Sequence, residues 1–167
     1  MVPLANVIIG VRNRFYDSIA MRNGKNWLTT ATWLQHFERN TVNNISSYLS
    51  DRSASTGVIG PIVPGVIVAE LPLHFWVALT STRYDKSIWR SSLASVFPRE
   101  ARPPIHGALD RIRTLRNWIA HHEHLLNRDL RQDAERIDRT LTMVAPTLAH
   151  RTRTMSTVID VLDRKPV

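Results

Sequence analysis

The stretch PIHGALDRIRTLRNWIAHHEHLL, residues 104–126, decides the fold class. Its large aliphatic side chains recur at spacings of three and four, which is the period of an α-helix. Pro104 suits the first helical position, where its missing N–H costs no hydrogen bond. The spacing therefore predicts a helix over 104–126 with one apolar stripe, formed by Leu109, Ile112, Leu115, Ile119 and Leu126.

Helical periodicity continues on both sides of this stretch. Residues 4–22 repeat apolar side chains at spacings of three and four and stop at Asn23-Gly24. Polar composition predicts a loop over 50–56, and the glycines, prolines and branched aliphatic residues of 58–68 favour an extended segment. Further helices are expected, in chain order, over residues 29–49, 70–80, 85–96, 129–148 and 154–162.

Length and composition are those of one folded domain. The chain has 167 residues, of which 43% are hydrophobic and 22% charged, so it can bury a sizeable core and is not a disordered or fibrous chain. Nothing repeats at a fixed period, and no internal linker is long enough to divide the chain. We expect one all-α domain over residues 1–167, a bundle of about five to seven helices.

Cysteine is absent, which excludes disulfides, thiolate zinc sites, iron–sulfur clusters and cysteine nucleophiles. A reducing cytoplasm fits this composition best. The only candidate for a membrane span, residues 57–79, is broken by Pro61, Pro64 and Pro72 and carries Glu70. No membrane partner is therefore expected.

Positive charge favours a polyanionic partner, with nucleic acid the first choice. The chain has 22 lysines and arginines against 14 acidic residues, a formal net charge of +8, and the excess is spread along its length. Nineteen of the basic residues are arginine. Their planar guanidinium groups suit phosphate, but the coding bias of a GC-rich genome would give the same composition, so both explanations stay open.

Chemistry-bearing residues are densest in the second half of the 104–126 helix. A helix turns by about 100° per residue, so Asn117 and His121 lie on one face of it. Arg116 lies beside that face and can flank a groove formed there. These three side chains can converge where two helices or two subunits meet. The structural alternative is a polar helix face that pairs with the next helix, for example with Asp129 or Asp133.

The same residues resemble a known family. The run RNWIAH, residues 116–121, resembles the R-N-x-x-x-H motif of HEPN domains, and its continuation HEHLLNR, residues 122–128, is similar to that of Abi-like abortive-infection proteins. VRN at 11–13 resembles the earlier "LRN" segment of that family, and the resemblance covers about residues 5–150. The middle of Abi-family chains is resembled, in order and spacing, by ELPLHFW at 70–76, Tyr84, Trp89 and Phe97-Pro98.

Two features depart from the family. The chain starts ten residues before VRN, where Abi-like chains commonly have further helices, so it resembles a shortened member or a fragment. Residues 57–68 are also more apolar and richer in proline than the family pattern.

The resemblance implies an α-helical HEPN-like bundle with a role in phage defence or in a toxin–antitoxin system, and hence a possible antitoxin partner. It also implies metal-independent RNA cleavage at a homodimer cleft, although some HEPN domains are not catalytic. The residues fit this chemistry. His121 would move the proton of the 2′-hydroxyl or of the leaving group, Arg116 would stabilise the phosphorane, and Asn117 would orient a phosphate oxygen or the histidine.

Other polar residues are second-rank candidates for contacts with RNA. They lie near the motif or repeat its arginine–asparagine pair, and for each a solvated or structural role is the alternative: His122, His124, Asn127, Arg128, Arg113, Arg12 and Asn13. No metal and no cofactor are expected, because the spacing of His121, Glu123 and His124 does not reproduce the i, i+4 pair of zinc-protease helices.

Two functions follow as the leading hypotheses. The first is a metal-independent endoribonuclease of the abortive-infection or toxin type that acts as a homodimer on RNA. The second is a non-catalytic module that uses the same basic surface to bind RNA or a partner protein. A purely structural interaction domain is a third, and it would show little salt dependence of RNA association.

Overall fold

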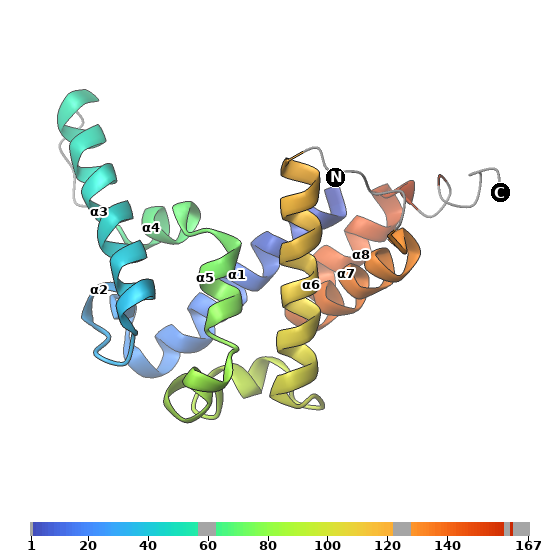
Figure 1. Ribbon diagram of the computed structural model, residues 1–167, viewed down its shortest axis with the longest axis horizontal. Helices are drawn as coiled ribbons and strands as arrows, with labels where there is room; N and C mark the ends of the chain where they lie inside the picture. The colour runs from blue at the N-terminus through green and yellow to red at the C-terminus, as the bar shows by residue number, and fades with distance from the viewer. Residues whose placement is uncertain (1, 57–62, 122–127, 159–160, 162–167) are drawn as a thin grey trace.

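The computed structural model describes residues 2–56, 63–121, 128–158 and 161. Over these residues the chain is helical and contains no strand, which confirms the all-α prediction (Figure 1). The described helices are α1 (Val2–Asn23), α2 (Trp27–Thr30), α3 (His36–Thr56), α4 (Pro64–Glu70), α5 (Leu73–Ala78), α6 (Arg102–Ala120), α7 (Leu130–Val144) and α8 (Pro146–Met155). Between α5 and α6 lie three short helical segments, η1 (Thr82–Tyr84), η2 (Asp85–Trp89) and η3 (Leu93–Val96).

The long helix α1 crosses the molecule, and the elements packed against it are α2, α4, α5, η3, α7 and α8 (Figure 1). In its first half Gly10 lies against α7 and Asn6 bonds to Thr152 of α8. In its second half Ser18 bonds to the Ser92 carbonyl oxygen just before η3. Phe15 of α1 meets Phe97 edge to face, with ring centroids 5.8 Å apart. One continuous core results, and its largest fully buried side chains include Phe15, Trp27, Trp76 and Tyr84.

Helix α6 agrees with the stripe predicted from the sequence. Ile105, Leu109, Ile112 and Leu115 are its buried side chains, and prolines occupy its first turn. The helix packs against α5 on one side and α7 on the other. It ends at Ala120 with His121 as the C-terminal cap, and residues 122–126 of the expected helix lie outside the described residues.

The prediction of a single helix over 129–148 is wrong, because the helix is interrupted between Val144 and Pro146. Ala145 has φ −153° and ψ 75°, which ends α7, and Pro146 begins α8. A proline inside a helical pattern lacks the N–H that would continue the ladder. The short helix expected over 154–162 is also wrong at its start, because α8 ends at Met155 and Ser156 is extended.

Three further expectations are wrong. Residues 50–56, expected as a loop, are the last turns of α3, which starts at His36. Of the segment 58–68, expected to be extended, residues 58–62 lie outside the described residues, and residues 64–68 belong to α4, which begins at Pro64. The segment 85–96 is a π turn followed by a 3-10 turn. These divisions produce more helices than the five to seven expected. No helix of the described segments has the length and hydropathy needed to span a bilayer.

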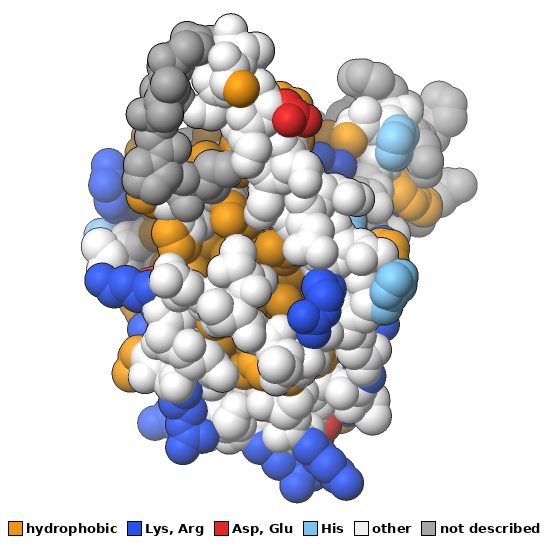
Figure 2. All heavy atoms as spheres, turned by 90° about the vertical axis from the view of Figure 1, so that its left-hand side faces the viewer, with side chains coloured by type: hydrophobic (Ala, Val, Ile, Leu, Met, Phe, Trp, Pro, Cys, Tyr) orange, Lys and Arg blue, Asp and Glu red, His pale blue; other side chains and the backbone are white. Residues whose placement is uncertain are grey.

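Helix α3 projects away from the remaining helices (Figure 1). The apolar spacing of 29–49 predicts Phe37 and Tyr48 inward and Glu38 outward, and the structure reverses this. Phe37 is 59% exposed and Tyr48 57%, whereas Glu38 is 0% exposed. Figure 2 shows hydrophobic side chains exposed on the side of the molecule that α3 occupies, with lysine and arginine side chains scattered around them.

Two glycines provide a matched test of the α1–α7 packing. A Cβ on Gly10 would lie 3.1 Å from Val144 Cγ2 and 3.2 Å from Leu141 Cδ1, so Gly10→Val is expected to lower the free energy of unfolding by about 1–3 kcal/mol. Gly107 lies within α6, and a Cβ added there would have no described atom beyond its own helix within 4 Å. Gly107→Ala is expected to raise stability by about 1 kcal/mol in urea denaturation. Equal effects of the two changes would contradict the close packing at Gly10.

Candidate functional site

The three motif residues lie together at the C-terminal end of α6. Arg116 and Asn117 belong to its last turns, and the backbone N–H of His121 donates to the Asn117 carbonyl oxygen at 3.0 Å. Arg116 Nη1 lies 3.4 Å from Asn117 Oδ1, to which it donates. Arg116 and His121 are exposed and Asn117 is half-buried. The helix therefore presents an arginine, an amide and an imidazole to solvent at one end.

The carboxylates that the structural alternative assigns to this face are engaged elsewhere. Asp129 caps α7, where its Oδ1 accepts from the backbone N–H of Gln132 at 2.9 Å. Asp133 is buried and accepts hydrogen bonds from Arg128 and Arg136. Among the described residues, the only hydrogen-bond partner of the Arg116 side chain is therefore Asn117.

Arg128 joins α6 to the start of α7. It pairs with Asp133, its Nη2 donates to the Arg111 carbonyl oxygen at 3.3 Å, and its guanidinium lies 5.3 Å from the centre of the Trp118 ring. The side chain is only 16% exposed. Its position near the motif is as expected, but these contacts hold two helices together and leave little of the guanidinium accessible.

The remaining second-rank candidates fall into three places. Arg113 lies one turn before the motif and pairs with Asp110 at 2.8 Å. Arg12 is on α1, where it donates to the Ala69 carbonyl oxygen at 3.1 Å and to Asn13 Oδ1 at 3.3 Å. These contacts link α1 to α4 and do not include the motif residues. His122, His124 and Asn127 lie outside the described residues.

A polar groove lies between α5, η1 and α6, and no pattern in the sequence predicts it. Its volume is about 490 Å³. Val77 and Ala78 contribute apolar surface to it. The polar lining comes from His74, Ser81, Thr82, Arg83, His106, Asp110 and Arg113.

Buried Glu38 of α3 anchors one wall of this groove. It accepts hydrogen bonds from Arg83 and, at 2.7 Å, from the Tyr84 hydroxyl, which itself accepts from the Gln35 N–H at 3.0 Å. Burial raises the pKa of Tyr84 well above its usual range, so this hydroxyl stays protonated and keeps donating. The contact fixes Arg83 and joins α3 to η1.

The two histidines of the groove differ in their surroundings. Burial lowers the pKa of His74, and the positive charge of Arg113 lowers it further, while Glu38 acts in the opposite direction. His106 Nδ1 lies 2.9 Å from Thr80 Oγ1. When the Thr80 hydroxyl donates its single proton to the Val77 carbonyl oxygen, 2.7 Å away, Nδ1 of His106 donates to Thr80 Oγ1. In neutral His106, Nε2 is therefore the acceptor.

A second groove, of about 620 Å³, runs between α6, α7 and α8 beside the start of α1. Leu115, Ile119, Leu130 and Leu141 are among its lining residues, and its surface is mainly apolar. None of the three motif residues lines it. The candidate functional side chains are therefore the motif residues at the end of α6 and the polar residues of the smaller groove.

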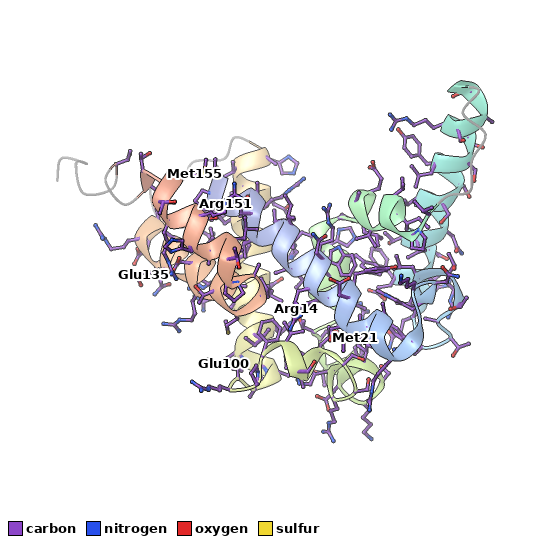
Figure 3. The ribbon with its side chains drawn as sticks, turned by 180° about the vertical axis from the view of Figure 1, so that it is seen from behind. Arg14, Met21, Glu100, Glu135, Arg151 and Met155 are labelled. Carbon is purple, nitrogen blue, oxygen red and sulfur yellow. The ribbon has the colours of Figure 1, made fainter. Side chains whose placement is uncertain are left out.

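Positive charge is spread over several helices rather than gathered at the motif. Arg14 of α1 and Arg151 of α8 are exposed and lie on the side of the molecule seen in Figure 3. No three histidine or acidic side chains within the described ranges are grouped closely enough to hold a metal ion.

No protein-family model matches this chain, and neither does any curated protein or solved structure. The likeness to Abi-like proteins with a HEPN motif therefore stays an expectation from the sequence. What bears on function is the set of side chains exposed at the end of α6 and those that line the polar groove.

Proposed function

We propose that this protein is a metal-independent endoribonuclease of the HEPN type, with Arg116, Asn117 and His121 as its catalytic residues. The observation that carries the proposal is that Arg116 is exposed and has no carboxylate partner among the described residues. Its neighbour Arg113 is paired with Asp110, and Arg128 with Asp133, whereas Arg116 is exposed with only Asn117 as a hydrogen-bond partner among the described residues. An exposed guanidinium without a carboxylate is available to a phosphate.

The proposed reaction is transesterification within the RNA backbone. A base removes the proton from a 2′-hydroxyl, whose oxygen attacks the adjacent phosphorus. The bond from phosphorus to the 5′-oxygen then breaks, and an acid protonates that oxygen. The products are a 2′,3′-cyclic phosphate and a 5′-hydroxyl, so no metal or redox partner is required by the balance of atoms.

Each motif residue has a place in this reaction. His121 is the proton-transfer group, because imidazole exchanges protons near neutral pH. Arg116 supplies charge-assisted hydrogen bonds to the phosphorane, where negative charge increases in the transition state. Asn117 donates its amide N–H to a phosphate oxygen, because its Oδ1 already accepts from Arg116.

A homodimer would complete the site. Two copies related by a two-fold axis that passes the end of α6 would bring two copies of His121 to one cleft, one as base and one as acid. The exposure of Arg116 and His121 supports this arrangement, because within the described part of the chain both side chains are open to a second copy. An antitoxin that covers this end would be the corresponding inhibitor in a phage-defence or toxin–antitoxin system.

The proposal predicts cleavage in the absence of divalent metal. Purified protein incubated with a labelled pool of single-stranded RNA and EDTA is expected to cut it and to leave 2′,3′-cyclic phosphate ends. Gel electrophoresis with and without phosphatase and kinase treatment identifies these ends. RNA that is bound but never cut would overturn the proposal in favour of the non-catalytic binding module.

A further inference from the structure

The polar groove and the motif lie on the same side of α6. His106, Asp110, Arg113 and Asn117 follow one another at spacings of four, three and four, which places them within about 60° of arc around the helix. Arg113, which lines the groove, precedes Asn117 by one turn, a rise of about 6 Å. A single-stranded RNA bound at the motif would therefore reach the polar groove along the surface of α6.

Charge in the groove is balanced, unlike charge at the motif. Arg83 is paired with buried Glu38, and Arg113 with Asp110. The environment of His74 disfavours its protonated form. The groove thus has little net charge although the chain carries +8. A phosphate would gain little there, whereas a neutral ligand with directional donors and acceptors fits.

Hydrogen-bond donors, acceptors and apolar side chains all line the groove. Arg113 uses Nε and Nη2 on Asp110 Oδ1, so its Nη1 remains to donate and Asp110 Oδ2 remains to accept. His106 offers Nε2 as a further acceptor, and Val77 and Ala78 form apolar contact surface. Side chains of Asp110 and Arg113 are 45% and 34% exposed, so a ligand can reach both.

We propose that this groove binds an unstacked nucleobase of single-stranded RNA, and that guanine is the base it prefers. Guanine presents two adjacent N–H donors on one edge, which match the two acceptors that remain, Asp110 Oδ2 and His106 Nε2, and acceptors on the next edge, which match the free Nη1 of Arg113. Base edges of single strands are the parts of RNA that proteins read by sequence. The proposal rests on the proposed function, because it makes the groove a specificity site beside the cleavage site.

Binding of defined RNAs tests the groove separately from catalysis. The probes are labelled oligouridines with guanosine, adenosine or cytidine at one central position, bound to the His121→Ala variant and followed by fluorescence anisotropy. The guanosine probe is expected to bind about 5- to 150-fold more tightly than the adenosine probe, the range for one good bidentate base contact. Asp110→Asn in the same background is expected to remove this preference.

Two further variants keep the test independent of folding. His106→Leu removes the Nε2 acceptor at similar size and is expected to weaken the guanosine preference. Asp138→Asn alters an exposed ion pair on α7 and is the matched control, expected to retain the full preference. Circular dichroism verifies helix content for each variant.

Outcomes for the groove and for the nuclease can be told apart. The groove proposal is overturned if the His121→Ala protein binds all probes alike, if it binds none of them, or if Asp110→Asn keeps the guanosine preference. RNA cleavage by the wild type with no base preference would reject the groove alone, whereas a guanosine preference without any cleavage would reject the nuclease alone.

Discussion

His121→Ala is expected to lower the rate of RNA cleavage by about 10²–10⁴-fold, the usual contribution of a positioned acid or base. The side chain of His121 is exposed at the end of α6, and the cap it provides is a backbone N–H to the Asn117 carbonyl oxygen. Alanine keeps that N–H, so the thermal unfolding midpoint is expected to stay within a few degrees. Single-turnover cleavage of a labelled RNA, beside a thermal melt, measures both quantities.

His150→Ala provides the control for this prediction. His150 is an exposed histidine on α8, so its removal changes the imidazole content without touching the motif. Its cleavage rate is expected to equal that of the wild type. Cleavage by His121→Ala at the wild-type rate would remove His121 from the mechanism, whatever the control shows.

Asp133→Ala is expected to lower the free energy of unfolding by about 3–5 kcal/mol, the range for breaking a buried charged pair. Asp133 is 5% exposed and holds two guanidinium groups, those of Arg128 and Arg136, whose side chains are 16% and 15% exposed. Without the carboxylate both cations remain partly buried and unpaired. Urea denaturation followed by circular dichroism measures the loss.

The same helix contains a matched control in Asp138. Its ion pair with Arg153 is open to water, since the two side chains are 43% and 51% exposed. Asp138→Ala is expected to cost no more than about 1 kcal/mol. Equal losses for Asp133→Ala and Asp138→Ala would show that burial does not determine the contribution of these pairs.

Regular local patterns account for what the sequence predicts well. The apolar stripe of α6 depends only on residues three and four apart, so Leu109, Ile112 and Leu115 are assigned to the core correctly. The exposure of Arg116 and His121 also agrees with their place beside that stripe. Local periodicity is therefore sufficient for α6 and for the position of the motif.

Burial of charged residues depends on distant partners and is not visible in local patterns. Glu38 sits in a polar run of α3, yet it is buried because Arg83 and Tyr84, far along the chain, satisfy its carboxylate. The polar groove has the same origin, since His74, Arg83 and His106 come from three separate elements. Their sequence neighbourhoods contain no signal for the contact.

The break between α7 and α8 is different, because a local signal exists. Pro146 marks the end of a helix, but the apolar seam continues at the same spacing to Leu148 and favours one long helix. In the structure the helix ends before Pro146 and the apolar seam still packs inward, because α8 packs on α7 and on α1. The proline should therefore take precedence over the seam when the two conflict.

Synthesis on the ribosome adds a timing constraint to the packing of α1. Its first half is covered by α7, where Gly10 approaches Leu141 and Val144 closely. Translation at roughly 5–20 residues per second places the completion of α7 several seconds after that of α1. Until then α2, α4, α5 and η3 are the elements available to cover α1, so assembly begins with these elements and finishes when α7 and α8 emerge. Nascent chains halted before residue 130 would expose the apolar face around Gly10 and are expected to be clients of chaperones.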